Sequence, residues 1–546
     1  MDNNTISISQ NYTEAVFHRN EKPLPPVNFE PNWTDHPSRY KIYNQVERFA
    51  LPLKRPDRCM SMAEVLSRFT TRDAERNNLS FDALSLMFHF AHGVLSRRLR
   101  ITWNPGLYTL AAYNNSVEAR GTASGGGLYP TEIYWACGRS GPLLPGLYHY
   151  DNAHHALARL ATGDATGYIQ RAAFEHPSVL ATDQFLLLSL NVWKNAFKYN
   201  NFGYHVITQD LGALISSLRF LAAGFQTDLQ PILWYQDEPL NHLLGLELDS
   251  ESVFAIVPLP LLEYSEPCKQ DIHPSASLPT SRLIKKSSFQ RSKEITVFDL
   301  NREVHRSTLL HEGSPTPGRK FSQASVDDVY RGSERIALPP PAIEGLQMNI
   351  LDTFQRRRSS FGSFSHQNPL SLVELATMLA FGAAICTYKA DVKMVEHTSS
   401  FTRQVVFANT VEGLEQGIYA YDQQQHCLWC VQKGDMRLFL QQHYFLQNYN
   451  PAETGALIAL VGHLDGMLEV YGNRGYRILN AEVGMAAQSI YMAAAALSCA
   501  CGAALGFNNG ALNTVLHLDQ TQEKTLLFLM VGHERFPSAD FDTRFE

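Results

Sequence analysis

The feature that most constrains the fold is an internal repeat that relates the two halves of this 546-residue chain. The string GLYHYD at 146–151 is answered by GIYAYD at 417–422, an offset of 271 residues. The string FGY at 202–204 is answered by RGY at 474–476, an offset of 272. Self-similarity at one long spacing is typical of a duplicated unit. The offset of 272 also relates three pairs of single residues: Gly212 and Gly484, Asn241 and Asn513, and Leu244 and Leu516.

The repeat extends toward the start of each half. LSFDALSLMFHFAHG at 79–93 corresponds to LSLVELATMLAFGAA at 370–384, at an offset of 291. The difference between the offsets indicates one large length change, about 20 residues missing from the second copy between 384 and 417. We therefore expect two copies of one domain, related along their whole length.

Hydrophobic patterning predicts mixed helices and strands in each copy. Apolar spacing predicts helices at 80–93 and 371–384, and Ser371 with Glu374 forms a capping box at the start of the second. Long Ala/Leu-rich helices are expected at 206–224 and 478–497. Alternating or continuous apolar runs predict strands at 146–151, 252–260, 417–422 and 525–534. This order of elements indicates an α+β fold.

The same patterns predict four regions. We expect an N-terminal extension at 1–55, a first domain at 56–264 and a second domain at 341–546. The intervening region, 265–340, begins with a stretch rich in Ser, Pro, Lys and Arg, so we interpret it as a linker or surface insertion.

Composition restricts the function classes. The 46 basic and 53 acidic residues give a net charge of −7, which argues against nucleic acid or an anionic membrane as a partner. Hydrophobic residues make up 45% of the chain, as in a well-buried globular protein. We find no window of about 18 uncharged apolar residues. The N-terminal MDNNTISISQ does not resemble a secretory signal, so we expect a cytoplasmic protein.

The eight cysteines are scattered. Cys427 and Cys430 form a C-x-x-C, but HCLWCV has strand character and lacks a second pair or a histidine at zinc spacing. Cys499 and Cys501 lie in an alanine-rich stretch that we predict to be helical. We expect reduced core thiols and no metal site.

The most distinctive string of the first copy, RGTASGGGLYPTEIY, runs from Arg120 to Tyr134. Its glycines allow close backbone approach to a flat ligand, and their amides and the Ser124 hydroxyl are expected to be free donors. A bare GGG is usually a turn that enters a strand. The flanking serine and LYPTEIY make this string more specific and indicate a ligand-binding loop.

This string strongly resembles the R-x-x-x-S-G-G-x-L-Y-P-x-E-x-Y signature of SagB-type dehydrogenases. These enzymes use flavin mononucleotide (FMN), have the nitroreductase fold, and oxidise thiazolines and oxazolines to thiazoles and oxazoles. The resemblance covers most of the chain, including FHRNEK at 17–22. In dimers of this fold the stretch lies over the flavin ring, while the other subunit holds the phosphate. The resemblance thus implies ring contacts from Ser124, Gly125 and Gly126, and it places Arg120 among the cofactor-binding residues.

A cationic run, Arg356-Arg357-Arg358-Ser359-Ser360, precedes the second-copy helix. An arginine triplet alone is usually a solvated charge run. Here it resembles the family's R-x-S motif, in which guanidinium groups bind the FMN phosphate bidentately. Arg535 follows the last strand, where the family has another phosphate cation. The first copy keeps Arg68 but ends in IVPLPLLEY, with no cation at that place.

Two further features match the family. The turn at Leu505-Gly506 corresponds to the one whose backbone amide contacts flavin nitrogen 5, whereas the same position in the first copy is Trp234. Lys198-Tyr199 corresponds to a Lys-Tyr pair implicated in proton transfer. We expect the ammonium to stabilise a Tyr199 phenolate that acts as general base.

These gains and losses are complementary. The first copy keeps the Ser-Gly loop and the Lys-Tyr pair, and the second keeps the phosphate cations and the Gly506 turn. The second copy has HTSSFTRQVVFA at 397–408 in place of the Gly run. We therefore expect an intrachain pseudo-dimer of two tandem nitroreductase-like domains, with one composite site and one FMN per chain.

The leading functional hypothesis is FMN-dependent oxidation of azoline rings in a peptide natural-product precursor, as the tandem form resembles the oxidases of cyanobactin pathways. We expect a peptide or carrier-bound substrate, partner biosynthetic enzymes and dioxygen as electron acceptor; a homodimer is compatible with the sequence. Alternatives are an FMN oxidase or desaturase of another natural-product intermediate, an NAD(P)H-dependent nitroreductase, and a flavin-free peptide-binding scaffold.

Overall fold

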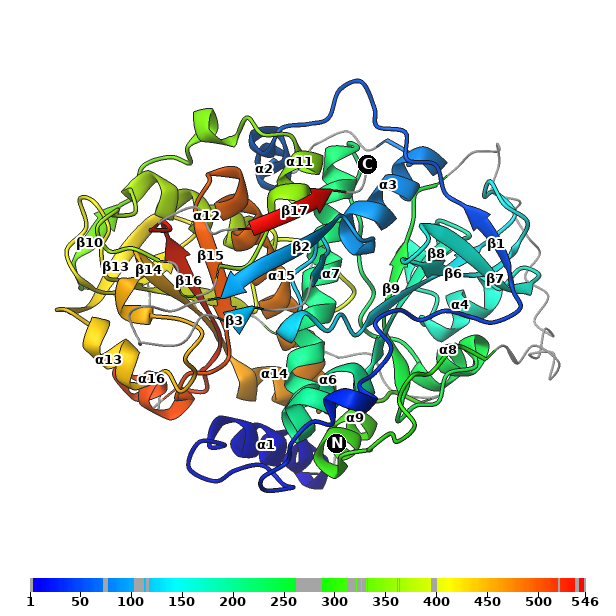
Figure 1. The fold of residues 1–546 in the computed structure, drawn as a ribbon, viewed down its shortest axis with the longest axis horizontal. Helices are drawn as coiled ribbons and strands as arrows, with labels where there is room; N and C mark the ends of the chain where they lie inside the picture. Colours follow the sequence, from blue (N-terminus) through cyan, green and yellow to red (C-terminus); the bar gives the residue numbers. More distant parts are fainter. Residues whose placement is uncertain are drawn as a thin grey trace.

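Two antiparallel sheets flank a pair of long central helices in the computed structural model (Figure 1). The sheet of the first half lies on the right of the view and that of the second half on the left. The structure describes residues 3–71, 77–102, 112–113, 117–261, 287–311, 321, 326, 330, 332–360, 362, 364–393, 400–518, 521–535 and 540–544.

The two sheets have corresponding strand orders. The first is β1-β7-β6-β5-β8-β9 and the second is β10-β13-β12-β11-β14-β16, with β15 added at the edge. The first-sheet strands are β1 (Glu47–Ala50), β5 (Thr131–Cys137), β6 (Gly146–Asp151), β7 (Ala156–Thr162), β8 (Gln184–Asn191) and β9 (Glu251–Pro258). The second-sheet strands are β10 (Arg335–Ala337), β11 (Thr402–Ala408), β12 (Gly417–Asp422), β13 (Cys427–Lys433), β14 (Ala456–Gly462), β15 (Ala500–Ala504) and β16 (Lys524–Gly532).

Irregularities in the sheets repeat as well. A register shift between Leu147 and Tyr148 recurs between Ile418 and Tyr419, at the offset of 271. A second shift, after Leu188 in β8, recurs after Leu460 in β14, at the offset of 272. Because a bulge adds a residue and bends a strand, its recurrence means that both sheets follow the same path.

Helices cover the sheets and fill the space between them. The first half has α2 (Met62–Thr70), α3 (Phe81–His92), α4 (Thr166–Ala172), α5 (Pro177–Leu180), α6 (Val192–Tyr199), α7 (Gly203–Gly224) and α8 (Asp237–Leu244), after α1 (Asn3–Phe17). The second half has α11 (Ile350–Arg356), α12 (Leu372–Ala384), α13 (Arg437–Gln442), α14 (Leu464–Tyr471), α15 (Arg474–Ala496) and α16 (Asn509–Val515). The expected capping box of Ser371 and Glu374 is present at the start of α12.

The central helices α7 and α15 cross at two glycines. A Cβ on Gly212 would clash with the carbonyl oxygen of Ala481, and one on Gly484 would clash with that of Gln209. The two contacts are related by the offset of 272, so each helix presents the same surface to the other, as in a two-fold interface. Nearly every residue of both helices is buried.

The starts of α2 and α11 are paired in the same reciprocal way. The Met62 amide donates to the Met348 carbonyl at 3.0 Å, and the Ile350 amide donates to the Met60 carbonyl at 3.0 Å. This contact places the first turns of the two helices side by side, in the symmetric relation that the repeat predicts.

One helical segment, Val192–Gly224, is long and apolar enough to cross a bilayer by length and composition. Its most apolar window is wholly buried inside the protein, as the core helix of a globular domain is. The segment also contains Asp210 and Arg219, which interrupt its uncharged runs.

Two sequence expectations need correction. The expected linker contains a packed helix, α9 (Asp299–Ser307), because Val304 and His305 are buried against the first copy. Cys499 and Cys501 are not helical: α15 ends before them, and Cys501 lies in β15. The stretch 262–286, most of 312–331, and 397–399 of the segment that replaces the Gly run lie outside the described residues.

The C-terminal strand β17 (Asp540–Arg544) also joins the two halves. It pairs with β2 (Ser96–Thr102) of the first half, which also pairs with the short strands β3 (Ala112–Tyr113) and β4 (Val117–Ala119). In Figure 1, β2 and β17 lie in front of the central helices.

The helix crossing makes a stability prediction. Gly212→Ala should lower the free energy of unfolding by roughly 1–3 kcal/mol, because the added methyl group overpacks a backbone contact. Gly167→Ala in α4 is the control: its Cβ would meet only the Arg171 guanidinium, at 3.7 Å, so a change within about 1 kcal/mol is expected. Urea denaturation of both variants checks this, and equal effects would contradict the close crossing.

Candidate functional site

The glycine-rich loop of the first copy, Ser124–Gly127 (the lid), has a backbone conformation that would strain a residue with a side chain. Gly126 and Gly127 have φ values of 65° and 68°, in the left-handed region that favours glycine. A Cβ at Gly126 would lie 2.5 Å from the Tyr199 hydroxyl and 3.0 Å from Lys198 Nζ. The lid and the expected Lys-Tyr pair are therefore adjacent.

Asp210 in α7 anchors the lid. Its carboxylate accepts hydrogen bonds from the Ser124 hydroxyl at 2.7 Å and from the Gly125 amide at 2.8 Å. These two donors are thus engaged within the protein, whereas we expected them to be free for a ligand. Burial raises the pKa of Asp210 to about 7, partly offset by the two hydrogen bonds.

The sequence analysis missed Asp210. The available signal was a lone carboxylate inside the apolar helix that follows FGY, seven residues after Gly203. Such a residue is rarely buried without partners. At the offset of 272 its counterpart is Glu482, which is also buried.

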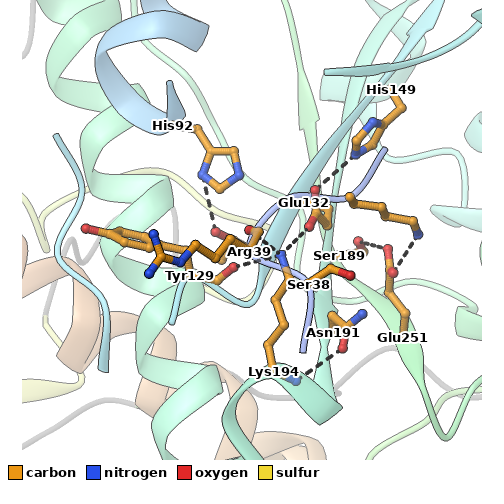
Figure 2. A network of polar contacts seen from close by, with 12 residues as sticks. Ser38, Arg39, His92, Tyr129, Glu132, His149, Ser189, Asn191, Lys194 and Glu251 are labelled. Carbon is orange, nitrogen blue, oxygen red and sulfur yellow. Dashed lines mark hydrogen bonds and ion pairs between the residues drawn. The ribbon is translucent and has the colours of Figure 1, made fainter. Parts of the chain in front are cut away.

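The residues downstream of the lid form a buried polar network (Figure 2). Glu132 accepts from Lys194 Nζ at 2.8 Å and pairs with His149 Nε2 at 3.0 Å. Burial alone would raise the pKa of Glu132, but Lys194 and His149 hold it well below its usual range. Lys194 also donates to the Tyr129 carbonyl at 3.3 Å, so the network fixes the segment just after the lid to α6.

Arg120 supports the loop rather than facing the second copy with its side chain. Its guanidinium lies 4.3 Å from the Tyr129 ring centroid and 3.3 Å from His92 Nε2. Its carbonyl oxygen reaches the other copy, where it accepts from Arg357 Nη2 at 2.9 Å. The Arg120 side chain thus packs within the first copy, while its backbone contacts Arg357 of the second.

Arg357 carries the clearest unsatisfied charge of the site. It is 5% exposed, and its Nε and Nη1 groups have no hydrogen-bond partner among the described residues. A buried guanidinium with unpaired N–H groups is costly unless an anion completes it. Ser359 lies nearby, with its hydroxyl 3.0 Å from that of Tyr491, a ring 5.5 Å from the Arg357 guanidinium. This arrangement suits an anion such as a phosphate group.

The remaining cations of the expected phosphate site face elsewhere. Arg356, Arg358 and Arg535 line a cavity of about 1030 Å³, together with Arg98 and Arg544. Arg357 and Ser359 both contact Tyr491 at the edge of this cavity, whereas Arg358 lies in the cavity wall. Arg535 is paired with Glu453 at 2.7 Å and Arg358 with Glu534 at 3.2 Å. The structure thus divides the expected phosphate ligands into two groups.

The Leu505-Gly506 turn is tied to the first copy through Arg19. The Arg19 guanidinium donates to the Leu505 carbonyl and lies 4.4 Å from the Phe202 ring centroid. Gly506 is covered by Leu446 and Tyr444, and its own carbonyl accepts from the Phe445 amide at 2.9 Å. Arg19, in the N-terminal extension, was not expected to be part of the site.

The electrostatics of the Lys-Tyr pair differ from expectation. Burial raises the pKa of Tyr199, and the nearby Asp210 adds to the rise, so the phenol stays protonated at neutral pH. Burial lowers the pKa of Lys198, whose Nζ lies 5.1 Å from the Tyr199 ring centroid. Desolvation outweighs the attraction between an ammonium and a phenolate, and it favours the neutral forms of both groups.

The equivalent location in the other copy is packed with side chains. Glu482, the counterpart of Asp210, accepts from Ser400 Oγ at 2.6 Å and from the Thr402 amide at 3.1 Å. It also pairs with Lys393 at 2.6 Å, and both side chains are almost fully buried. Lys393 Nζ lies 4.3 Å from the Tyr388 ring centroid.

Aromatic rings complete this packing. Trp234 is the counterpart of Gly506 and Tyr471 that of Tyr199; their ring centroids are 6.2 Å apart, and both rings are buried. The bulk expected at Trp234 therefore occupies the place where a flavin ring would need an open turn.

The pKa of Asp210 makes a prediction about stability and pH. Because this pKa is raised to about 7, the native protein retains a proton that the unfolded chain releases near pH 4. Stability from this group is present below about pH 4 and lost as the pH rises to about 7. Asp210→Asn should remove this loss, which is on the order of a few kcal/mol. Urea unfolding at several pH values measures how the free energy of unfolding changes with pH. Asp299→Asn, at an exposed residue, should keep the wild-type pH dependence.

Comparison with known proteins identifies the fold. Residues 356–533 match the model described as the nitroreductase family. A protein of Methanocaldococcus jannaschii whose name places it among the nitroreductases is 26% identical over 196 residues, which are 36% of this chain and 94% of that protein. A crystal structure from Anabaena variabilis, also named among the nitroreductases, has a TM-score of 0.72 at 22% identity and covers 97% of this chain and 99% of that one.

A chain of the E. coli microcin synthetase complex McbBCD is also similar, at 16% identity, over 47% of this chain and 92% of that one, but its TM-score of 0.25 is too low to support an inference. The family match implies an oxidoreductase of the flavin type. Residues 356–533 thus match the nitroreductase family, and the chain as a whole has a nitroreductase-like α+β fold.

Proposed function

We propose that this protein is an FMN-dependent oxidase that converts thiazoline or oxazoline rings of a peptide natural-product precursor to thiazoles or oxazoles. One observation carries the proposal. The Lys198 amine and the Tyr199 hydroxyl lie against Gly126 of the lid, and the carbonyl of Arg120, just before the lid, contacts the unsatisfied Arg357 guanidinium. A proton-transfer pair and an anion site, one from each half of the chain, thus border the same loop.

FMN would be held by the ligand group that contains Arg357 and Ser359. Arg357 has two unpaired N–H groups for phosphate oxygens, and Ser359 and Tyr491 add hydroxyl groups beside it. The lid and the Leu505-Gly506 turn would contact the ring, as the resemblance to SagB-type enzymes implies. Because the reciprocal location is filled by Trp234 and its neighbours, we infer one FMN per chain.

The oxidation removes two hydrogens from the azoline ring, one as hydride and one as a proton from the adjacent atom. Bound FMN supplies the hydride acceptor. The proton goes to Lys198, whose pKa is lowered by burial, and the protonated Tyr199 hydroxyl donates a hydrogen bond to the ring heteroatom. This reverses the roles that we expected from the resemblance to the family's Lys-Tyr pair. Dioxygen would accept the two electrons and two protons and leave as hydrogen peroxide.

The substrate would be a peptide or a carrier-bound azoline delivered by partner biosynthetic enzymes in the cytoplasm. Association of two chains into a homodimer is compatible with this proposal. Nucleic acids and anionic membranes have no role in it, because the net charge of −7 disfavours both as partners.

The two groups of arginines predict different effects on FMN binding. Arg357→Ala should raise the dissociation constant for FMN by about 10- to 100-fold, because charge-assisted hydrogen bonds to phosphate are lost. Arg358→Ala, which faces the cavity, should change it by less than about threefold. Fluorescence titration of the apoprotein measures the dissociation constant of each variant. Flavin released on denaturation gives the FMN content, which should be one per chain in the wild type. The opposite ranking would place the phosphate in the cavity.

The proton-transfer pair predicts a loss of turnover without a loss of flavin. Lys198→Met should lower kcat for a thiazoline-containing peptide by about 100-fold or more, because the proton acceptor is removed. Tyr199→Phe should have a smaller effect, since it removes only a hydrogen bond. Mass spectrometry detects the loss of two hydrogens, and FMN content serves as the control. Full activity in Lys198→Met would refute the assigned role.

A further inference from the structure

Three side chains of metal-ligand type converge beside the arginine-lined cavity. Glu374 lies in the first turn of α12, Cys499 follows α15 and His533 follows β16, and their ligand atoms all lie within 4.8 Å of one another. We call these residues the triad. The sequence offered no spacing motif for them, because the three residues come from separate elements, and we therefore expected no metal site.

The fold does not require the triad. At the offsets of 291 and 272, Glu374 and Cys499 correspond to Ala83 and Thr227 in the first copy, where the helices that match α12 and α15 form without them. Neither replacement could ligate a metal through a carboxylate or a thiolate. One member has a second role: a Glu374 oxygen accepts from the Ser371 amide at 2.9 Å in the capping box.

Two members of the triad face the large cavity. Cys499 and His533 line its wall, and His533 Nε2 lies 3.3 Å from a Glu374 oxygen. The side chains of Glu374 and His533 are 21% and 29% exposed, so a small ion can reach them from the cavity. Atoms bound to one tetrahedral ion lie about 3–4 Å apart, so only a small inward movement separates the present arrangement from a ligand set.

Sulfur, imidazole nitrogen and carboxylate oxygen together suit zinc-class ions. A thiolate and a carboxylate balance the two charges of such an ion, so the loaded site has no net charge beside the arginines of the cavity. Three protein ligands leave one coordination position, which would open into the cavity.

We propose that Glu374, Cys499 and His533 bind one divalent zinc-class ion, with the fourth position open to the arginine-lined cavity. The ion would join the start of α12, the end of α15 and the end of β16. This site is separate from the Lys198-Tyr199 pair and does not depend on the proposed function.

The test uses Co²⁺ as a spectroscopic probe. The full-length protein is treated with EDTA, desalted and titrated with CoCl₂, and difference spectra are recorded against the same flavin-containing sample without cobalt. We expect one Co²⁺ per chain, with a thiolate-to-cobalt band in the near ultraviolet. Cys499→Ser should abolish the band, and Cys501→Ser, which lines the same cavity outside the triad, should keep it.

Glu374→Gln is the sharpest second variant, because glutamine also completes a capping box but is a much weaker metal ligand. It should weaken Co²⁺ binding at least about tenfold while leaving the thermal midpoint of the metal-free protein close to wild type. No retained cobalt, or an undiminished band in Cys499→Ser, would overturn the proposal and leave the triad as a hydrogen-bonded cluster. FMN content is measured in the same samples. Cobalt bound without flavin would contradict only the azoline oxidase proposal, and flavin bound without cobalt would contradict only the metal site.

Discussion

The crossing of α7 and α15 at Gly212 and Gly484 is the contact on which the rest of the structure depends. Two helix backbones approach so closely there that neither position has room for a Cβ. This approach brings the lid of the first half next to α15, where the Ala123 amide donates to Gln488 Oε1 at 2.9 Å and Gln488 Nε2 donates to the Gly121 carbonyl at 3.1 Å. Any loosening of the crossing would separate the lid from Arg357 and so divide the candidate site.

Within this two-fold arrangement, corresponding residues differ in chemistry while keeping their places. Asp210 and Glu482 occupy equivalent positions, and each accepts hydrogen bonds from the segment that leads into a central strand. Asp210 has no cationic partner among the described residues and lies near Tyr199, whereas the buried Lys393 neutralises Glu482. Aromatic rings fill the space around the Glu482–Lys393 pair. The asymmetry between the halves is thus a difference in packing and charge at matched positions.

Much of the fold and part of the site could be predicted from the chain alone. The repeat offsets predicted the correspondence of strands, which extends to the shifted registers at Leu147 and Ile418. The Gly run and the Lys-Tyr dipeptide were both identified, and they lie together. The sides on which Arg357 and Arg358 lie could not be predicted, because the helix ends just before them and only packing selects the face that each side chain takes. Asp210 and Arg19 were missed for a related reason: their partners are distant in sequence.

The sequence by itself determined the duplication, the α+β elements and the residues available for chemistry, because these follow from local patterns and from self-similarity. The tertiary structure alone decided their use. It turned the Ser124 hydroxyl and the Gly125 amide toward Asp210, and it left the Arg357 guanidinium buried with two N–H groups unpaired among the residues that the structure describes. It also reversed the expected electrostatics of Lys198 and Tyr199, since the cost of burying a charge depends on the surroundings that only the folded chain creates.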